Sequence, residues 1–150
     1  GAYGGTKKIM SHLAPLGSTY QAGTLSGNPV AVSAGIATFE VLGQPDFYKS
    51  LNEKADVLIQ SLRALVKGKL TINAIGSMFT IFFTSGNVEN YKDAKRSDIK
   101  AFAKYFHTLL DQGLYCSPAQ FEANFISLTH SKDDLATFAN TIGVIAEQLA

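Results

Sequence analysis

The chain has 150 residues, 46% of them hydrophobic and 17% charged, a composition typical of a globular protein and unlike that of a disordered segment. Its 13 basic and 12 acidic residues leave a formal charge of +1, which gives no electrostatic case for binding nucleic acid or an anionic membrane surface. A single cysteine, Cys116, excludes a disulfide or a cysteine zinc site within the chain and fits a reducing compartment. No apolar run approaches the roughly 18 to 20 residues that span a bilayer.

Residues 1–48 start with a glycine-rich stretch and continue, after Pro29, into the apolar segment Val30 to Leu42. Because this segment is apolar on every side, it predicts a buried helix. The sequence "GQPD" at residues 43–46 then ends it. We expect residues 1–48 to be the trailing part of a larger domain, and the chain to be cut from a longer protein.

Residues 49–150 have a different pattern. Apolar residues at 51, 55, 58, 62 and 65 predict an amphipathic helix from Leu51 to Val66 that Gly68 closes. Strand-like segments follow at 70–74 and 78–84, with Gly76 and Ser77 between them, and a polar linker occupies 85–96.

A second amphipathic helix is predicted from Asp98 to Gln112, followed by short strands at 114–117 and 125–129. Ser131 with Asp134 resembles a capping box that opens a final helix. The order of these elements predicts a small α+β domain over residues 49–150, with helices on one face of a mostly antiparallel sheet.

The stretch "YQAGTLSGNPVA", Tyr20 to Ala31, allows two interpretations. A loop rich in Gly, Ser and Thr ahead of a helix offers N–H groups and hydroxyls to a phosphate, next to the positive end of the helix dipole. Alternatively, Ser26 or Asn28 merely caps the helix, with Pro29 in its first turn. The glycine spacing matches neither a Walker loop nor a Rossmann fingerprint.

The histidines and the cysteine give little indication of function. His12, His107 and His130 lack metal-ligand spacing, so we expect no metal site. Cys116 lies in a predicted short strand and is better explained as a small core residue than as a nucleophile.

Several motifs occur in one order along the chain: "GAYGG", "APLGSTYQAGTLSGNPVAVSAGIATFEVL", "GSMFTIFFT" and "FHTLLDQGLYCSPAQFEANFISLTHS", before the closing helix. In this order they resemble the glutamate-1-semialdehyde 2,1-aminomutase family, which belongs to the class III aminotransferases, pyridoxal 5'-phosphate (PLP) enzymes of fold type I. The resemblance implies that 1–48 is the tail of the α/β large PLP-binding domain and 49–150 the C-terminal small domain. It places the Schiff-base lysine just upstream of "GAYGG", so this chain carries no catalytic lysine.

The resemblance also implies site residues. Thr24, with the backbone at Gly23, matches the family's threonine that binds the cofactor phosphate of the opposite subunit. Tyr20 matches a tyrosine reaching toward the same site across the dimer interface. Glu122 matches a glutamate that lines the substrate site where related aminotransferases place an arginine; on the residues alone, it is a surface turn residue after Pro118.

The function implied is the conversion of glutamate-1-semialdehyde to 5-aminolevulinate, in porphyrin (tetrapyrrole) biosynthesis, by a homodimer that cycles between PLP and pyridoxamine 5'-phosphate. We expect such a protein to be cytoplasmic, or in the plastid stroma if its source is a plant, and we expect this chain alone to be inactive. Two alternatives stay open: another semialdehyde-like class III aminotransferase, and a lysine-less, non-catalytic interaction module.

Overall fold

The structure is a computed structural model that describes residues 2–148. It divides the chain into two compact units, Gly1–Gln44 and Pro45–Ala150. The division falls a few residues ahead of the boundary expected between residues 48 and 49, because the helix that opens the second unit starts earlier than the apolar pattern indicated.

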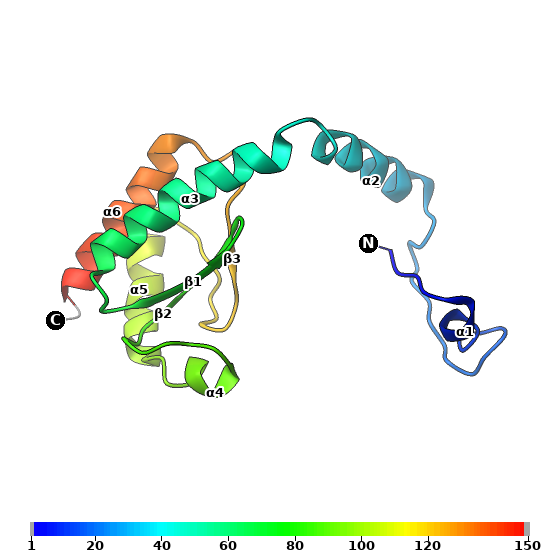
Figure 1. The fold of residues 1–150 in the computed structure, drawn as a ribbon, viewed down its shortest axis with the longest axis horizontal. Coiled ribbons are helices and arrows are strands. Elements are labelled where there is room, and N and C mark those ends of the chain that lie inside the picture. The colour runs from blue at the N-terminus through cyan, green and yellow to red at the C-terminus, as the bar shows by residue number, and fades with distance from the viewer. Residues whose placement is uncertain (1, 149–150) are drawn as a thin grey trace. The chain divides into compact units, whose positions relative to one another are not determined.

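The first unit holds a one-turn helix, α1 (Lys7–Met10), and a longer helix, α2 (Pro29–Leu42), joined by a loop (Figure 1). No residue of α2 is buried, and Val30 and Phe39 are 78% and 74% exposed. The prediction of a buried helix is therefore wrong for this chain. Its own unit offers only a loop and a single helical turn beside it, and these supply too little apolar surface to cover fourteen residues.

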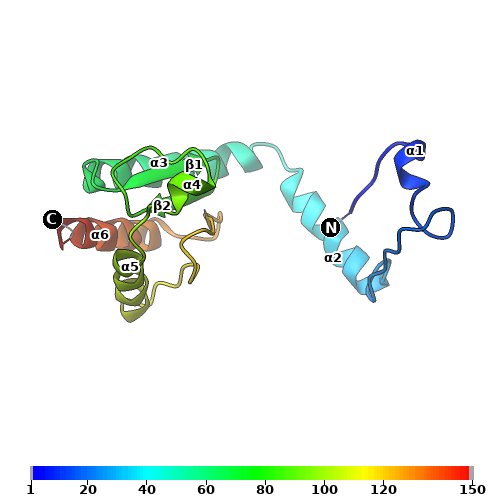
Figure 2. The same cartoon turned by 90° about the horizontal axis from the view of Figure 1, so that it is seen from below.

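The second unit is an α+β fold, as the sequence predicts. Its elements are α3 (Phe47–Val66), β1 (Thr71–Ile75), β2 (Met78–Phe82), α4 (Tyr91–Ala94), α5 (Ile99–Asp111), β3 (Asn124–Phe125) and α6 (Lys132–Gln148). The strands form one antiparallel sheet in the order β1-β2-β3. Helices α3 and α6 lie side by side in both views (Figures 1 and 2), and α5 packs against α6.

The core lies between these helices and one face of the sheet. On β2 and the residue after it, Phe79, Ile81 and Phe83 join the main core, while Phe82 packs with Val88 and Ala94 in a second small cluster. This alternation follows from the period of two in a strand. The segment predicted as a polar linker therefore contains α4 and helps to cover the opposite side of β2.

Two predicted strands differ in the structure. Residues 114–117 form no strand, and of 125–129 only Phe125 is in a strand, as part of β3. The Leu114 N–H donates to the Leu109 carbonyl and so completes the end of α5, and Pro118 has no N–H to give to a ladder. Of the two short strands predicted between α5 and α6, the structure forms only one, β3.

The predicted starts of α5 and α6 are confirmed by their caps. The Asp98 carboxylate accepts from the N–H groups of Lys100 and Ala101 at the start of α5. Ser131 and Asp134 bond reciprocally at the start of α6, as a capping box does. Among residues 2–148, no helix combines the length and the apolar character that crossing a membrane requires.

Replacing Leu62 by alanine tests the core. Leu62 is fully buried on the face of α3 that meets α6, so its loss should lower the free energy of unfolding by about 2–5 kcal/mol. Val57, on the same helix, is 68% exposed, and Val57→Ala should change it by no more than about 0.5 kcal/mol. Urea unfolding of the two variants measures both; equal losses would contradict this packing.

Candidate functional site

The loop between α1 and α2 is closed on itself just ahead of Tyr20. The Thr19 N–H donates to the His12 carbonyl, and the Ala14 N–H donates back to the Thr19 carbonyl, both at 2.9 Å. Gly17 sits inside this closure, where a Cβ atom would collide with the His12 carbonyl group. Only glycine fits there, so the sequence requirement at Gly17 fixes the path by which the chain reaches Tyr20.

The next turn ends in a capped helix. The Ser26 N–H donates to the Gly23 carbonyl at 2.9 Å. The Asn28 side chain then accepts from the N–H groups of Val30 and Ala31 at 3.0 and 3.2 Å, with Pro29 at the first helical position. Of the two interpretations of this stretch, capping by Asn28 is what the structure shows at the helix start. A phosphate would have to bind to the turn before the helix instead.

Tyr20, Gly23 and Thr24 lie together on this exposed loop. Among the described residues, neither the Tyr20 hydroxyl nor the Thr24 hydroxyl has a hydrogen-bond partner. A Cβ atom on Gly23 would lie 2.6 Å from Ser26 Oγ, so the turn is tight at that position. The loop therefore presents the hydroxyls of Tyr20 and Thr24 beside a tight turn in which Ser26 packs against Gly23, and it contains no acidic residue.

Glu122 lies in the second unit, on the loop that leads to β3. Its N–H donates to the Ala119 carbonyl at 3.2 Å, and its carbonyl accepts from Thr80 Oγ1 at 3.4 Å. Its carboxylate is exposed but held, because Ser117 Oγ donates to Glu122 Oε2 at 2.6 Å. The serine was not predicted from the sequence; a Ser-Pro pair opening a turn was the signal that could have indicated it.

A buried polar pair anchors the same loop. Ser97 Oγ accepts from the Phe83 N–H at 2.7 Å and donates to Gln120 Oε1 at 2.8 Å. Gln120 Nε2 donates to the Ile81 carbonyl at 2.9 Å. Both side chains are 5% exposed, and their bonds satisfy backbone groups of β2 and the residue after it, beyond the pairing with β3.

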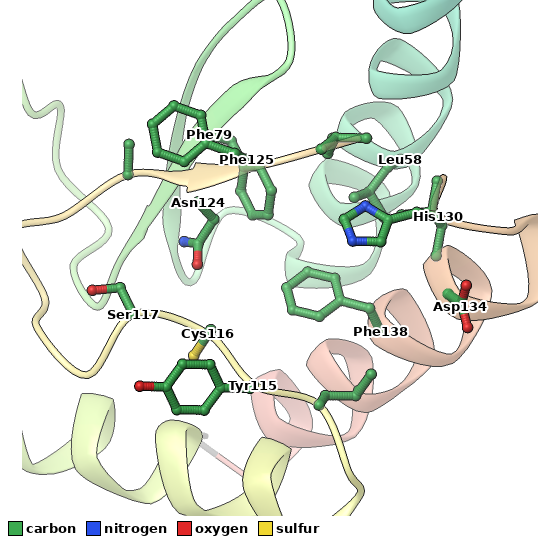
Figure 3. Close-up of a pocket in the computed structure, with 14 residues that line it drawn as sticks. Leu58, Phe79, Tyr115, Cys116, Ser117, Asn124, Phe125, His130, Asp134 and Phe138 are labelled. Carbon is green, nitrogen blue, oxygen red and sulfur yellow. The ribbon is translucent and has the colours of Figure 1, made fainter. Parts of the chain in front are cut away.

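One cavity of the second unit has a volume of about 300 Å³ and is mostly apolar (Figure 3). Its walls come from α3, the sheet, α6 and the segment after α5, and they include Leu58, Phe79, Leu114, Phe125, Leu135 and Phe138. Polar groups of Ser117, Asn124, His130 and Asp134 also reach it. Glu122 does not line this cavity, so the cavity and the predicted site residue are separate features.

Cys116 is half-buried and unsuited to nucleophilic chemistry. Burial raises the pKa of its thiol, which keeps the protonated, poorly reactive form at neutral pH. Burial also raises the pKa of the neighbouring Tyr105, whose hydroxyl has no hydrogen-bond partner among the described residues. These two groups belong to the packing beneath the loop.

His130 has a structural role in the loop before α6. Its Nδ1 atom accepts from the Ser127 N–H at 3.1 Å. Its carbonyl, like that of Leu128, accepts from Lys54 Nζ at 2.6 Å, which ties this loop to α3. No group of three metal-ligating side chains gathers within residues 2–148.

The capping box at α6 makes a pH-dependent contribution to stability. Hydrogen bonds from the side chain and the backbone of Ser131 hold the pKa of Asp134 below its ordinary value of 3.8. Because the folded pKa is lower than the unfolded one, the carboxylate stabilises the fold above about pH 4, and the effect disappears as the pH falls through the folded pKa.

Asp134→Asn should therefore lower the free energy of unfolding at pH 7, and the difference from the wild type should shrink as the pH falls below about 4. The neighbouring Asp133→Asn, which removes no such bonds, is the control and should show the smaller pH-dependent difference. Urea unfolding at pH 7, 5 and 3 measures this. A constant difference across the series would contradict the role of the charge.

Comparison with known proteins places the whole chain in one family. The family model described as aminotransferase class-III matches residues 1–145. The chain belongs to the class III aminotransferases. It is 45% identical over 150 residues to a glutamate-1-semialdehyde 2,1-aminomutase of Desulforapulum autotrophicum, covering 97% of this chain and 35% of that protein. The chain thus spans about a third of the length of the relatives it matches.

Solved structures of an aminotransferase and of an aminomutase share the fold. A β-phenylalanine aminotransferase from Variovorax paradoxus superposes with a TM-score of 0.81 at 26% identity, covering 97% of this chain and 34% of that one. A lysine-to-alanine variant of a glutamate-1-semialdehyde aminomutase from Pseudomonas aeruginosa PAO1 was solved in complex with pyridoxamine 5'-phosphate (PMP). It gives a TM-score of 0.75 at 20% identity, covering 95% of this chain and 33% of that one.

Proposed function

We propose that this chain is the C-terminal part of a PLP-dependent, homodimeric aminomutase that converts glutamate-1-semialdehyde to 5-aminolevulinate. The observation that carries the proposal is the identity of 45% to an aminomutase over an alignment that covers 97% of this chain. Gly1–Gln44 would belong to the large cofactor-binding domain and Pro45–Ala150 would be the small domain.

The loop at Tyr20 to Thr24 fits a cofactor phosphate. The Thr24 hydroxyl is exposed and unbonded within the described residues, and no carboxylate on the loop would repel the anion. When bound, the cofactor supplies a carbonyl that takes up an amino group in its PLP form, and the amine that returns it in its pyridoxamine 5'-phosphate form. Thr24 and the backbone at Gly23 would hold its phosphate across the dimer interface, and Tyr20 would reach the same site.

Glu122 would select the substrate by charge. A carboxylate repels a second carboxylate of a substrate and accepts hydrogen bonds from an amino group, whereas an arginine does the opposite. Neither of the two arginines can take that place on this loop: Arg63 lies on α3, and Arg96 pairs with Asp93 at 3.3 Å. An enzyme that moves the amino group within one molecule needs no pocket for an external amino acid donor.

A second candidate is another class III aminotransferase, which the TM-score of 0.81 to the β-phenylalanine aminotransferase favours. The two functions differ in the amino donor. The purified full-length enzyme should convert glutamate-1-semialdehyde without any added amino acid if it is an aminomutase. An absolute need for an external amino donor would identify an aminotransferase instead.

Thr24→Val should weaken binding of PLP to the full-length enzyme. It keeps the side-chain shape and removes a hydrogen bond to a charged group, worth about 1.5–3 kcal/mol, so the dissociation constant should rise roughly ten- to hundredfold. The control is Thr38→Val, because the Thr38 hydroxyl only donates to the Ala34 carbonyl within α2. Absorbance titration with PLP measures both.

Mixed dimers test whether Thr24 acts across the interface. When one subunit lacks the cofactor-binding lysine and its partner carries Thr24→Val, the lysine-bearing site receives a wild-type threonine and should bind PLP normally. When one subunit carries both changes, the lysine-bearing site of its unchanged partner receives the loop altered by Thr24→Val and should bind PLP more weakly. The reverse order would show that Thr24 serves its own subunit.

Glu122→Arg in the full-length enzyme should reduce aminomutase activity more than it reduces PLP occupancy, because the change reverses the charge that faces the substrate. Glu53→Arg, an equal charge change at an exposed position of α3, should leave both nearly unchanged. Turnover and bound PLP are measured on the same preparations. If activity and PLP occupancy fell in parallel, Glu122 would be acting on folding instead.

A further inference from the structure

We infer that Ser117 is a positioning residue for Glu122 and sets how tightly the enzyme holds its substrate. The inference deepens the proposed function and rests on it, since the part that Glu122 plays toward the substrate is itself proposed. The contact between the two side chains does not depend on that role: Ser117 Oγ lies 2.6 Å from Glu122 Oε2.

The hydroxyl of Ser117 has one proton, and the geometry indicates where it goes. Two acceptors are in reach, Glu122 Oε2 at 2.6 Å and the Ala119 carbonyl at 3.5 Å. The short contact to a charged oxygen is the stronger one, so the proton points to the carboxylate. A lone pair of the same oxygen accepts the Ala119 N–H at 3.3 Å, which fixes the hydroxyl from its other side.

The backbone around this contact is also fixed. Gln120, between the two residues, is buried and bonds Ser97 and the Ile81 carbonyl. Glu122 is itself held through both its N–H and its carbonyl. An exposed glutamate ordinarily samples several rotamers, and ordering such a side chain costs free energy when a ligand binds. Here Ser117 orders it beforehand, with one carboxylate oxygen occupied and Oε1 left for the substrate.

The test uses full-length, PLP-loaded enzyme with glutamate-1-semialdehyde as substrate. Ser117→Ala should raise KM about three- to tenfold, the range of one hydrogen bond to a charged but exposed group, and leave kcat within about twofold. Thermal unfolding and PLP affinity should stay unchanged, and Ser117→Thr, which retains a hydroxyl, should restore KM. The matched control is Ser61→Ala, because the Ser61 hydroxyl only donates to the Val57 carbonyl within α3.

A double-mutant cycle separates this inference from the role of Glu122. The second variant is Glu122→Met, which keeps the side-chain length but has no oxygen to accept the Ser117 hydroxyl. If Ser117 acts through Glu122, Ser117→Ala should raise KM in the wild type and add nothing in a Glu122→Met background. An equal increase in both backgrounds would overturn the inference. An effect of Glu122→Met with none of Ser117→Ala would also overturn it while leaving the role of Glu122 intact. No effect of Glu122→Met would refute that role and the inference together.

If the full-length enzyme does not convert glutamate-1-semialdehyde, the proposed function is wrong and KM cannot be measured. The contact between Ser117 and Glu122 can still be tested without turnover. Crystal structures of the wild type and of Ser117→Ala then decide about the contact itself. Glu122 should occupy one conformer in the wild type and several in the variant. The same single conformer in both would overturn the positioning role.

Discussion

The short pairing of β3 with β2 is the constraint on which the arrangement of the second unit depends. β3 pairs only with Met78 and Phe79, so the backbone of β2 beyond them needs other partners. The buried side chains of Ser97 and Gln120 supply these partners and thereby tie the loop from residue 117 to 122 to the sheet. A buried backbone group without a hydrogen-bond partner would cost free energy. The same hydrogen bonds therefore satisfy the backbone of β2 and hold the loop in place.

Helices α3 and α6 support the sheet and the segment that follows β3. Their shared apolar face, centred on Leu62 and Ile142, closes the core beneath the sheet. Lys54 on α3 binds the carbonyls of Leu128 and His130, so that the chain leaving β3 is fixed as well. A side chain that recognises a substrate by charge gains from such support, because little conformational entropy is left to lose on binding.

The first unit is held together mainly by local hydrogen bonds and not by a buried core. Its loop is closed by backbone hydrogen bonds around Gly17 and by the Asn28 cap, while the apolar surface of α2 stays uncovered in this chain. An apolar helix of this kind is stable when other surfaces pack on it. This fits the proposal that Gly1–Gln44 belongs to a larger cofactor-binding domain, since the relatives are about three times as long as the stretch they share with this chain.

The sequence by itself determined α3, α5 and α6, the capping box at Ser131 and the α+β class, because apolar periodicity and caps are local signals. It also carried the family, through motifs such as "AGTLSGNP". Only the tertiary structure decided that α2 is exposed, that residues 114–117 form no strand, and that Ser117 binds Glu122. Burial, strand pairing and side-chain contacts depend on which surfaces meet in space, and no pattern along the chain records that.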